Sequence, residues 1–233
     1  KLINWIVSDI IVRNGDMMIG TYLTIQLPMI SDPKTEALKA NLKLPCGIKK
    51  IYLYNKLITI LNTNIISRLY ELEELYIYMQ NFNLPLDNLP HGLKILSVCS
   101  SDFNQPVNNL PENLQYLYLN SCSFNNNLDC LPSGLKVLSI CSSNFTHELN
   151  NLPLGLEILH LNINDELSSS FDYLPETLIC LYLTSTYIKS DLSNLPIGLV
   201  VLYVETRELK NTSLLRYKNL PSNIKQKSIK SRY

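Results

Sequence analysis

Residues 89–109 have the sequence LPHGLKILSVCSSDFNQPVNN, residues 110–130 have LPENLQYLYLNSCSFNNNLDC, and residues 131–151 have LPSGLKVLSICSSNFTHELNN. These are three consecutive copies of one 21-residue pattern. A strict period of this length is typical of solenoids, in which one supersecondary unit cannot bury its apolar side alone and stacks on copies of itself. The sequence therefore predicts a stack of coils with one continuous, shared core.

The pattern extends in both directions from this stretch. With the first residue of each unit counted as position 0, units of 21–25 residues begin at Leu44, Arg68, Leu89, Leu110, Leu131, Leu152, Leu174, Leu195 and, in degenerate form, Leu220. Positions 4, 7 and 9 are aliphatic in every unit, except for Lys227 at position 7 of the last. We predict eight repeats over 44–219, a degenerate last repeat with a basic C-terminal tail over 220–233, and an N-terminal cap over 1–43.

Positions 7 and 9 alternate with polar or amphipathic residues, which is the period of a strand with one buried face. Each unit therefore contributes one short parallel strand. The pattern LxxLxL within 20 to 29 residues is that of the leucine-rich repeat, whose strands line the inner face of a curved solenoid. The predicted fold is a leucine-rich-repeat solenoid with a curved parallel β-sheet on the concave face, an irregular convex side and a small mixed α/β N-terminal cap.

A second motif recurs at positions 14 and 15, as Phe82-Asn83, Phe103-Asn104, Phe124-Asn125 and Phe145-Thr146. Its clearest copy is FNQPVNNLPENLQYL. With this motif, residues 44–224 resemble the FNIP-type leucine-rich repeat family, which is abundant in social amoebae and in giant viruses of amoebae. Later units depart from the family pattern and replace the Phe with Glu166 or Leu167, Ile188 and Leu209.

Members of this family often carry an amino-terminal F-box that docks a ubiquitin ligase. Residues 1–43 contain no F-box pattern, so the resemblance does not carry ligase recruitment over to this chain. Residues 2–13 have apolar side chains at helical spacing before Asn14-Gly15, which favours a helix. Residues 22–27 alternate as a strand, and residues 32–40 open with Asp-Pro and favour a short helix. Together these elements are expected to cover the first open strand of the solenoid.

Five of the seven glycines occupy position 3, and Asn replaces glycine there in two further units. A column of Gly and Asn indicates a positive φ angle in the turn that follows each Leu-Pro. The glycines of this column are Gly47, Gly92, Gly134, Gly155 and Gly198. Glu71 and Thr177 break the column, so we expect strained or differently shaped turns at these two residues.

The composition limits the classes of function. The apolar content is 46% and the net charge is zero, as in globular proteins. No apolar segment approaches the ~18 residues that cross a bilayer, and the six cysteines form no CxxC pair. We expect reduced thiols, no membrane association, and an intracellular location in the cytoplasm, which is that of the host cell if the protein is viral.

The charges are segregated along the chain. Residues 69–204 contain three Lys or Arg and fourteen Asp or Glu, whereas both ends of the chain are basic. An acidic body repels phosphate backbones. We therefore predict that no nucleic acid binds in the central groove, and we interpret the basic tail as solvated.

No pattern in the sequence indicates catalysis. The three histidines, His91, His147 and His160, fall at positions 2, 16 and 8, on different faces of different units, so they form neither a metal triad nor a Cys-His pair. The paired acids Glu73-Glu74 and Asp165-Glu166 are interpreted as solvated turns or strand ends, and the glycines are used in the turns. We predict that the protein is not an enzyme and has no catalytic residue, metal site or cofactor.

The outward positions 6, 8 and 10 of the strands are rich in tyrosine, and a large exposed aromatic surface usually indicates a partner. We predict that a protein partner binds the concave face, where Ser97 and Ser139 leave small gaps. The predicted contact residues are Tyr52, Tyr54, Tyr76, Tyr78, Tyr116, Tyr118, His160, Tyr182 and Tyr203.

Two alternatives to this hypothesis remain open. The tyrosines can also stabilise the sheet through cross-strand pairs, and the two roles are compatible. The predicted function is that of a non-catalytic protein-binding scaffold. The alternative function is substrate recognition within a larger adaptor, such as an F-box ubiquitin-ligase receptor, whose effector domain lies outside this sequence.

Overall fold

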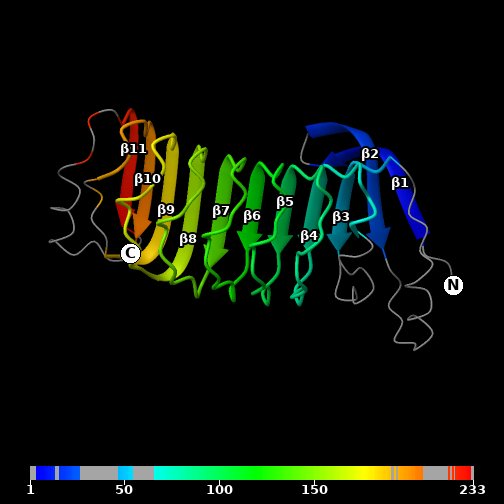
Figure 1. Cartoon of the computed structure of the whole chain (residues 1–233), viewed down its shortest axis with the longest axis horizontal. Helices are drawn as coiled ribbons and strands as arrows, with labels where there is room; N and C mark the ends of the chain where they lie inside the picture. The colour runs from blue at the N-terminus through cyan, green and yellow to red at the C-terminus, as the bar shows by residue number, and fades with distance from the viewer. Residues whose placement is uncertain are drawn as a thin grey trace.

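The computed structural model describes residues 4–13, 16–26, 47–54, 66–189, 192, 194–206, 220, 222 and 224–231. These residues form one eleven-stranded sheet in which the strands follow one another in sequence order (Figure 1). The strands are β1 (Asn4–Arg13), β2 (Asp16–Gln26), β3 (Lys50–Tyr54), β4 (Glu74–Tyr78), β5 (Ile95–Cys99), β6 (Tyr116–Asn120), β7 (Val137–Ser142), β8 (Ile158–Leu167), β9 (Cys180–Ile188), β10 (Val201–Thr206) and β11 (Gln226–Ser231).

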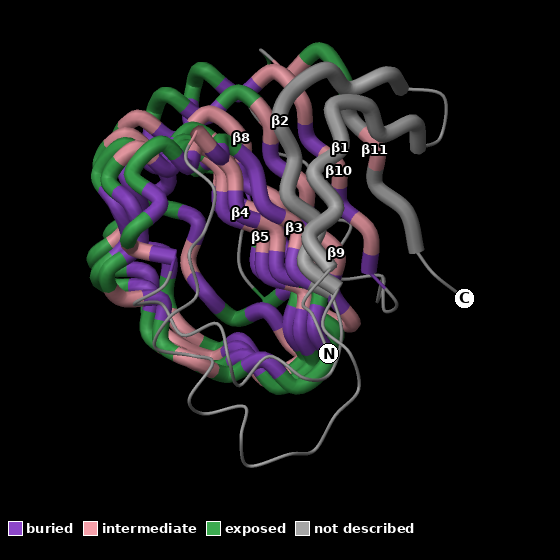
Figure 2. Tube along the Cα trace, turned by 90° about the vertical axis from the view of Figure 1, so that its right-hand side faces the viewer, coloured by how far each residue is buried: buried purple, intermediate pink, exposed green. Residues whose placement is uncertain are grey.

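Each repeat contributes one strand, and the strands from β2 to β11 pair in parallel. Equal positions of neighbouring units face one another, so that Leu96 pairs with Leu117 and Leu117 with Leu138. Figure 2 looks along the stack and shows the strands on one side of the coil and the exposed turns on the other. This arrangement confirms the predicted leucine-rich-repeat solenoid.

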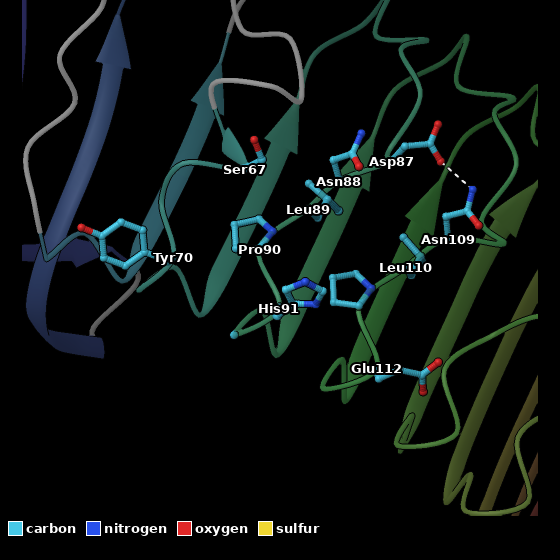
Figure 3. Close-up of a pocket in the computed structure, with 12 residues that line it drawn as sticks. Ser67, Tyr70, Asp87, Asn88, Leu89, Pro90, His91, Asn109, Leu110 and Glu112 are labelled. Atoms are coloured by element: carbon cyan, nitrogen blue, oxygen red, sulfur yellow. Dashed lines mark hydrogen bonds between the residues drawn. The ribbon is translucent and has the colours of Figure 1, made fainter.

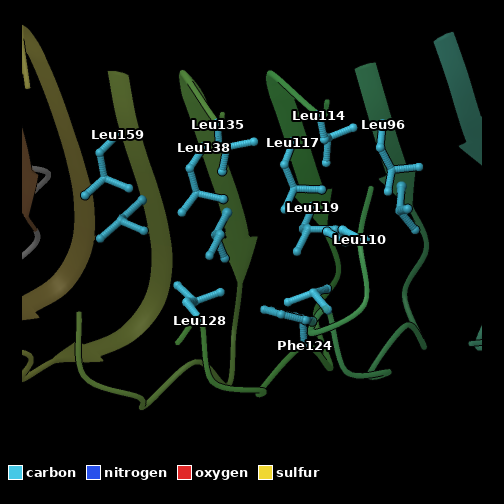
Figure 4. Close-up of a cluster of buried hydrophobic side chains, with 14 of the residues drawn as sticks. Leu96, Leu110, Leu114, Leu117, Leu119, Phe124, Leu128, Leu135, Leu138 and Leu159 are labelled. Atoms are coloured by element: carbon cyan, nitrogen blue, oxygen red, sulfur yellow. The ribbon is translucent and has the colours of Figure 1, made fainter. Parts of the chain in front are cut away.

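The core is a set of side-chain columns that run along the stack between the strands and the turns (Figure 4). Positions 4, 7 and 9 form three of these columns, and their described residues from Ile48 to Val204 are almost fully buried. Burial of one such side chain contributes roughly 1.5–3 kcal/mol. Because each column is shared between coils, no coil buries its apolar residues alone.

The Phe-Asn motif has two structural roles. The rings of Phe103, Phe124 and Phe145 are buried and stacked, with centroids 6.1 and 6.3 Å apart and nearly parallel planes. The Asn side chain at position 15 accepts a hydrogen bond from the backbone N–H of the same position in the next coil. These bonds run from Asn104 N to Asn83 Oδ1 (2.9 Å), from Asn125 N to Asn104 Oδ1 (2.9 Å) and from Thr146 N to Asn125 Oδ1 (3.0 Å). The motif therefore joins coils through both apolar packing and hydrogen bonds.

The phenylalanine column ends at Phe145, and Leu167 and Ile188 fill its place in the next two coils, as the apolar substitutions predicted. The extra residue of the unit that begins at Leu152 is absorbed as a register shift between β8 and β9, after Ile163. Position 18 forms a further buried column that the sequence analysis did not identify. It consists of Leu86, Val107, Leu128, Leu149, Phe171 and Leu192.

Buried serines form another column that the sequence analysis missed. The hydroxyls of Ser100, Ser121 and Ser142, at position 11, donate to backbone carbonyls of the preceding coil. The acceptors are Phe82 O (2.8 Å), Phe103 O (2.8 Å) and Phe124 O (2.7 Å). A buried carbonyl without a hydrogen-bond partner costs about 1–3 kcal/mol. These hydroxyls supply that partner to one backbone carbonyl on the turn side of each coil.

The helix predicted over residues 2–13 is wrong, because residues 4–13 form β1, antiparallel to β2. The segment is rich in Ile and Val, which favour strands. Asn14-Gly15 lies between the paired residues Arg13 and Asp16, and Asn-Gly is the strongest signal for a two-residue hairpin. Strand β2 includes most of the strand predicted over 22–27 and pairs with β3, so the hairpin extends the sheet. The helix predicted over 32–40 lies outside the described residues.

The positive φ predicted for the glycines of position 3 is found only at Gly47 among the described glycines. The other four turns close through a hydrogen bond from the backbone N–H of position 4 to the carbonyl of the proline at position 1, for example Leu135 N to Pro132 O (3.1 Å). At Gly134 and Gly198 the turn needs glycine because the preceding coil is close, whereas Gly155 has more room. A Cβ atom would lie 3.0 Å from Glu112 O at Gly134 and 2.7 Å from Glu176 O at Gly198.

Other residues at position 3 carry side chains that donate to these same carbonyls. Thr177 Oγ1 donates to Leu154 O (2.7 Å) and to Leu156 O (2.8 Å), and Asn113 Nδ2 donates to His91 O (2.9 Å). The different turn shape expected at Thr177 is also wrong, because this turn closes like the others, with Leu178 N donating to Pro175 O. Position 3 therefore carries either no side chain or a hydrogen-bond donor in these coils, except for the exposed Glu71.

Replacing Leu138 with Asp is expected to unfold the protein, because a carboxylate would have no partner in the core shared by neighbouring coils. Leu138 is 0% exposed, whereas Leu154, on a turn, is 84% exposed and offers a matched control. Circular-dichroism melting should show no cooperative transition for Leu138→Asp and a nearly unchanged Tm for Leu154→Asp. An unchanged Tm for Leu138→Asp would show that the register is wrong.

Two glycines at the same position give a second test of the packing. Gly198→Ala is expected to destabilise the fold by about 1–3 kcal/mol, because the new methyl group meets a backbone carbonyl that cannot turn away. At Gly155 the nearest backbone atom, Ser133 O, is 3.6 Å from the Cβ position, so Gly155→Ala should change stability by less than about 1 kcal/mol. Denaturant unfolding measures both. Equal losses would point to a backbone requirement for glycine instead of a steric one.

Candidate partner-binding face of the sheet

Alternate residues of strands β3 to β10 point away from the core, and we call this surface the open face. The strands β5 and β6 show the alternation, with a buried residue between each pair of outward ones. All the sequence-predicted contact residues belong to these outward positions. The side chain of Tyr54, at the end of β3, lies outside the described part of the chain. The others form three groups along the sheet.

The first group lies on β3 and β4. The rings of Tyr52 and Tyr76 stack with centroids 4.6 Å apart, and Tyr78 lies 6.4 Å beyond Tyr76. The Tyr76 hydroxyl donates to Glu74 Oε2 at 2.8 Å, and the Lys50 ammonium lies 2.5 Å from the same carboxylate oxygen. Lys50, Glu74 and Tyr76 therefore form one connected polar cluster within this group.

The electrostatics of this first group fix its protonation states. Burial and the hydrogen bond to Glu74 raise the pKa of Tyr76, so its hydroxyl stays protonated and donates. Burial alone lowers the pKa of Lys50, but the hydrogen bond and the charge of Glu74 outweigh it and raise that pKa above its ordinary value. The Lys50 ammonium also lies 5.5 and 5.2 Å from the ring centroids of Tyr52 and Tyr76, within the range of a cation–π contact. These contacts favour a stabilising role for the first group.

The second group is Tyr116 and Tyr118 on β6. Ser97 and Ser139 pair with Tyr118 on its two sides, so the ring stands between two short side chains. Tyr118 is 38% exposed, and partial burial, followed by the proximity of Tyr116, raises its pKa. Neither hydroxyl hydrogen-bonds to another residue in the part of the chain that the structure describes. Both phenols are therefore available to donate to a ligand.

The third group lies on β8, β9 and β10. The His160 ring meets Tyr182 edge-on at 6.0 Å between centroids, and Tyr182 meets Tyr203 at 6.3 Å. His160 Nδ1 is 3.2 Å from the Ser139 hydroxyl, and the Tyr203 hydroxyl donates to Glu205 Oε2 at 3.0 Å. Partial burial lowers the pKa of His160, which favours the neutral imidazole at pH 7.

Three cysteines on the same face were not among the predicted contact residues. Cys99, Cys141 and Cys180 are partly exposed free thiols on β5, β7 and β9. Burial raises the pKa values of Cys141 and Cys180, so these thiols are protonated and are poor nucleophiles at pH 7. Their outward positions, 10 and 6 of the repeat, were the signal in the sequence.

A cavity of about 660 Å³ lies elsewhere, beside the turns that precede β4, β5 and β6 (Figure 3). Its wall includes Tyr70, His91 and Glu112, and Asn109 Nδ2 donates to Asp87 Oδ1 across it at 2.9 Å. The sequence analysis placed no contact residue there. The cavity is open and has a mixed polar and apolar lining, and it gives a competing location for a ligand.

The described residues contain no group of three His, Cys, Asp or Glu side chains arranged to hold a metal ion. His91 lies on a turn and His160 on the open face, whereas His147 Nε2 is 3.2 Å from Asn125 O. The three histidines are thus on separate surfaces. Within the same described residues, no helix has the length and apolar character to span a membrane.

Comparison with known proteins found a likeness among solved structures. No protein-family model matches the chain, and no curated protein matches its sequence. Among solved structures, the chain is similar to one described as "The crystal structure of CroV588 a novel circular LRR protein structure", with 23% identity and a TM-score of 0.48. The match covers 72% of this chain and 28% of that protein, so this chain spans less than a third of its length. The leucine-rich-repeat fold itself rests on the strand register and core described above.

The lowered pKa of His160 predicts a pH dependence of stability. The unfolded imidazole binds a proton below about pH 6.5, whereas the folded one resists protonation, so stability should fall as the pH drops below that value. The loss between about pH 7 and 5 should be smaller in His160→Asn than in the wild type. Denaturant unfolding across this range measures it, with His91→Asn as the control on an exposed turn. Parallel pH profiles for the wild type and His160→Asn would contradict the assignment.

Proposed function

We propose that this protein is a non-catalytic scaffold that binds another protein on the open face, with Tyr116 and Tyr118 at the centre of the contact. The single observation that supports this best is the pair of tyrosine hydroxyls on β6 without an intramolecular partner in the described residues. Tyrosine combines a large apolar ring, few rotatable bonds and a polar tip, which suits it to binding surfaces.

The surroundings of Tyr116 and Tyr118 indicate that the groups of the open face contribute unequally to partner binding. Lys50 contacts the rings of Tyr52 and Tyr76, and Glu74 accepts the Tyr76 hydroxyl, so a partner gains little by replacing those contacts. The aliphatic residues Ile95, Val137 and Ile158 stand in one partly exposed row beside Tyr116. A partner that covers β5 to β8 therefore buries apolar area around a central aromatic pair, which is the usual arrangement of a binding hot spot.

Three further statements belong to the same proposal. The repeats are of the FNIP type, and the double role of the Phe-Asn motif supports this assignment. The protein acts inside the cell, which stays a prediction from the cysteine pattern. Its open face excludes nucleic acid, which stays a prediction from the acidic charge. Recognition of a substrate within a larger adaptor stays the alternative hypothesis.

Replacing Tyr118 with Ala is expected to weaken partner binding by about 1–3 kcal/mol, the scale of an aromatic hot spot, while Tm changes little. Tyr173 is also exposed but lies on a turn, so Tyr173→Ala is the matched control. The measurement is quantitative affinity capture with the three proteins, followed by titration of the recovered partner. Tyr70→Ala tests the cavity at the turns, where Tyr70 is 75% exposed.

Two results would contradict this assignment. Lost stability of Tyr118→Ala with intact capture would show that the tyrosines serve the sheet alone. Lost capture in Tyr70→Ala, with Tyr118→Ala unaffected, would move the binding site to the turns.

A further inference from the structure

The middle of the open face carries no formal charge. From β5 to β9, the outward residues at positions 6, 8 and 10 include no Asp, Glu, Lys or Arg. They are Ile95, Ser97, Cys99, Tyr116, Tyr118, Asn120, Val137, Ser139, Cys141, Ile158, His160, Asn162, Cys180, Tyr182 and Thr184. Most of them are half-buried between their neighbours, and Tyr118 and Asn120 are exposed.

This neutrality contrasts with the acidic charge of the same coils. Residues 69–204 contain fourteen acids and three bases. Many of these acids are exposed on the turns and loops between strands, among them Asp102, Glu112, Asp129, Glu148, Asp172 and Glu176. The folded coil therefore separates an acidic turn side from a neutral open face.

The charged residues of the open face lie at its margins, and each already has a partner. Lys50 contacts Glu74 at the β3–β4 end. Glu166, in the last part of β8, lies 2.5 Å from the Lys189 ammonium. Glu205 on β10 accepts the Tyr203 hydroxyl. The charges nearest the central strands are at position 5, just before them, and these are also paired: Lys94 Nζ lies 2.6 Å from Glu73 Oε2, and Lys136 Nζ lies 2.9 Å from Glu157 Oε1.

A neutral surface of this kind discriminates between partners by desolvation. A charged side chain of the partner that becomes buried against β5 to β9 loses its hydration and finds no opposite charge, which is costly. An aliphatic or aromatic side chain gains from the same contact in proportion to the area it buries. Serine, asparagine and tyrosine groups on the face can still satisfy backbone and hydroxyl groups of the partner.

We propose that the occupant of the open face is an uncharged segment of another protein, rich in aliphatic and aromatic side chains, and that the face excludes charged segments. This inference rests on the proposed function and specifies the chemistry of the partner. It implies that binding depends little on ionic strength, because no charge pair crosses the centre of the contact.

The test is selection of a phage library of random peptides on the immobilised full chain, followed by titration of synthetic peptides from the enriched clones. Enriched peptides should lack Lys, Arg, Asp and Glu in their shared core. Their dissociation constants should change by less than about twofold between about 50 and 500 mM NaCl. Tyr118→Ala should weaken them, as the proposed function requires.

Two variants that add the same positive charge, one on the open face and one on a turn, test whether the neutrality of the face matters. Val137→Lys, at the centre of the face, should weaken the selected peptides by about tenfold or more, and selection on this variant should enrich Asp and Glu. Leu154→Lys adds the same charge on a turn and should change neither result. Melting curves verify that both variants fold.

The outcomes distinguish the proposed binding face from the inferred uncharged chemistry of the partner. Peptides that depend on Tyr118 but contain Lys or Arg and dissociate in high salt would overturn the inference and leave the binding face in place. Peptides indifferent to both Tyr118→Ala and Val137→Lys would overturn the proposed function. A dimer of the full chain in sedimentation analysis, lost in Val137→Lys, would make a second copy the occupant and overturn the inference.

Discussion

In-register stacking of equal positions on neighbouring coils is the constraint on which the rest of this structure depends. Adjacent strands lie about 4.8 Å apart, so each side chain has its counterparts from the two neighbouring coils as its closest contacts. Leu117, for example, pairs with Leu96 on one side and Leu138 on the other. At the buried positions a residue is therefore tolerated only if it packs well against residues of similar size and polarity in the neighbouring coils. This explains why the coils over residues 68–194 keep a period of 21 residues and absorb one extra residue, in the second half of β8.

The same constraint decides which features the sequence predicts. The columns at positions 4, 7 and 9 are visible because an apolar residue recurs there, and the strands and the open face follow from their spacing. Among the described glycines of position 3, the predicted positive φ is found only at Gly47, because a positive φ and a close backbone both produce a recurring glycine in a sequence. Only coordinates separate them, as the 2.7 Å distance at Gly198 shows. The buried Ser121 was missed because serine is usually exposed, and its acceptor, Phe103 O, belongs to another coil.

Two further limits concern the cap and the candidate site. In residues 2–13, a helical spacing of apolar residues coincides with β-branched content, and pairing of Arg13 with Asp16 shows that the strand is formed. On the open face, the sequence placed the tyrosines at outward positions and left two roles open for all of them, partner binding and stabilisation of the sheet. The structure distinguishes them, because Lys50 and Glu74 meet only when β3 and β4 are in register. Contacts between units depend on register and cannot be read within one unit.

Stacking also limits where charge can be placed on a solenoid. Like charges at one position of adjacent coils would face each other a few ångströms apart, which is destabilising. The column just before the strands avoids this by alternating sign, since Glu73 lies 3.1 Å from Lys49 and 2.6 Å from Lys94. On the turn side, Asp87, Asp129 and Asp172 occur in every second coil, and each accepts a hydrogen bond from an Asn of the next coil. A continuous face can therefore carry a uniform chemistry only if that chemistry is neutral, and tyrosine, serine and asparagine are residues that can repeat there and still bind a partner.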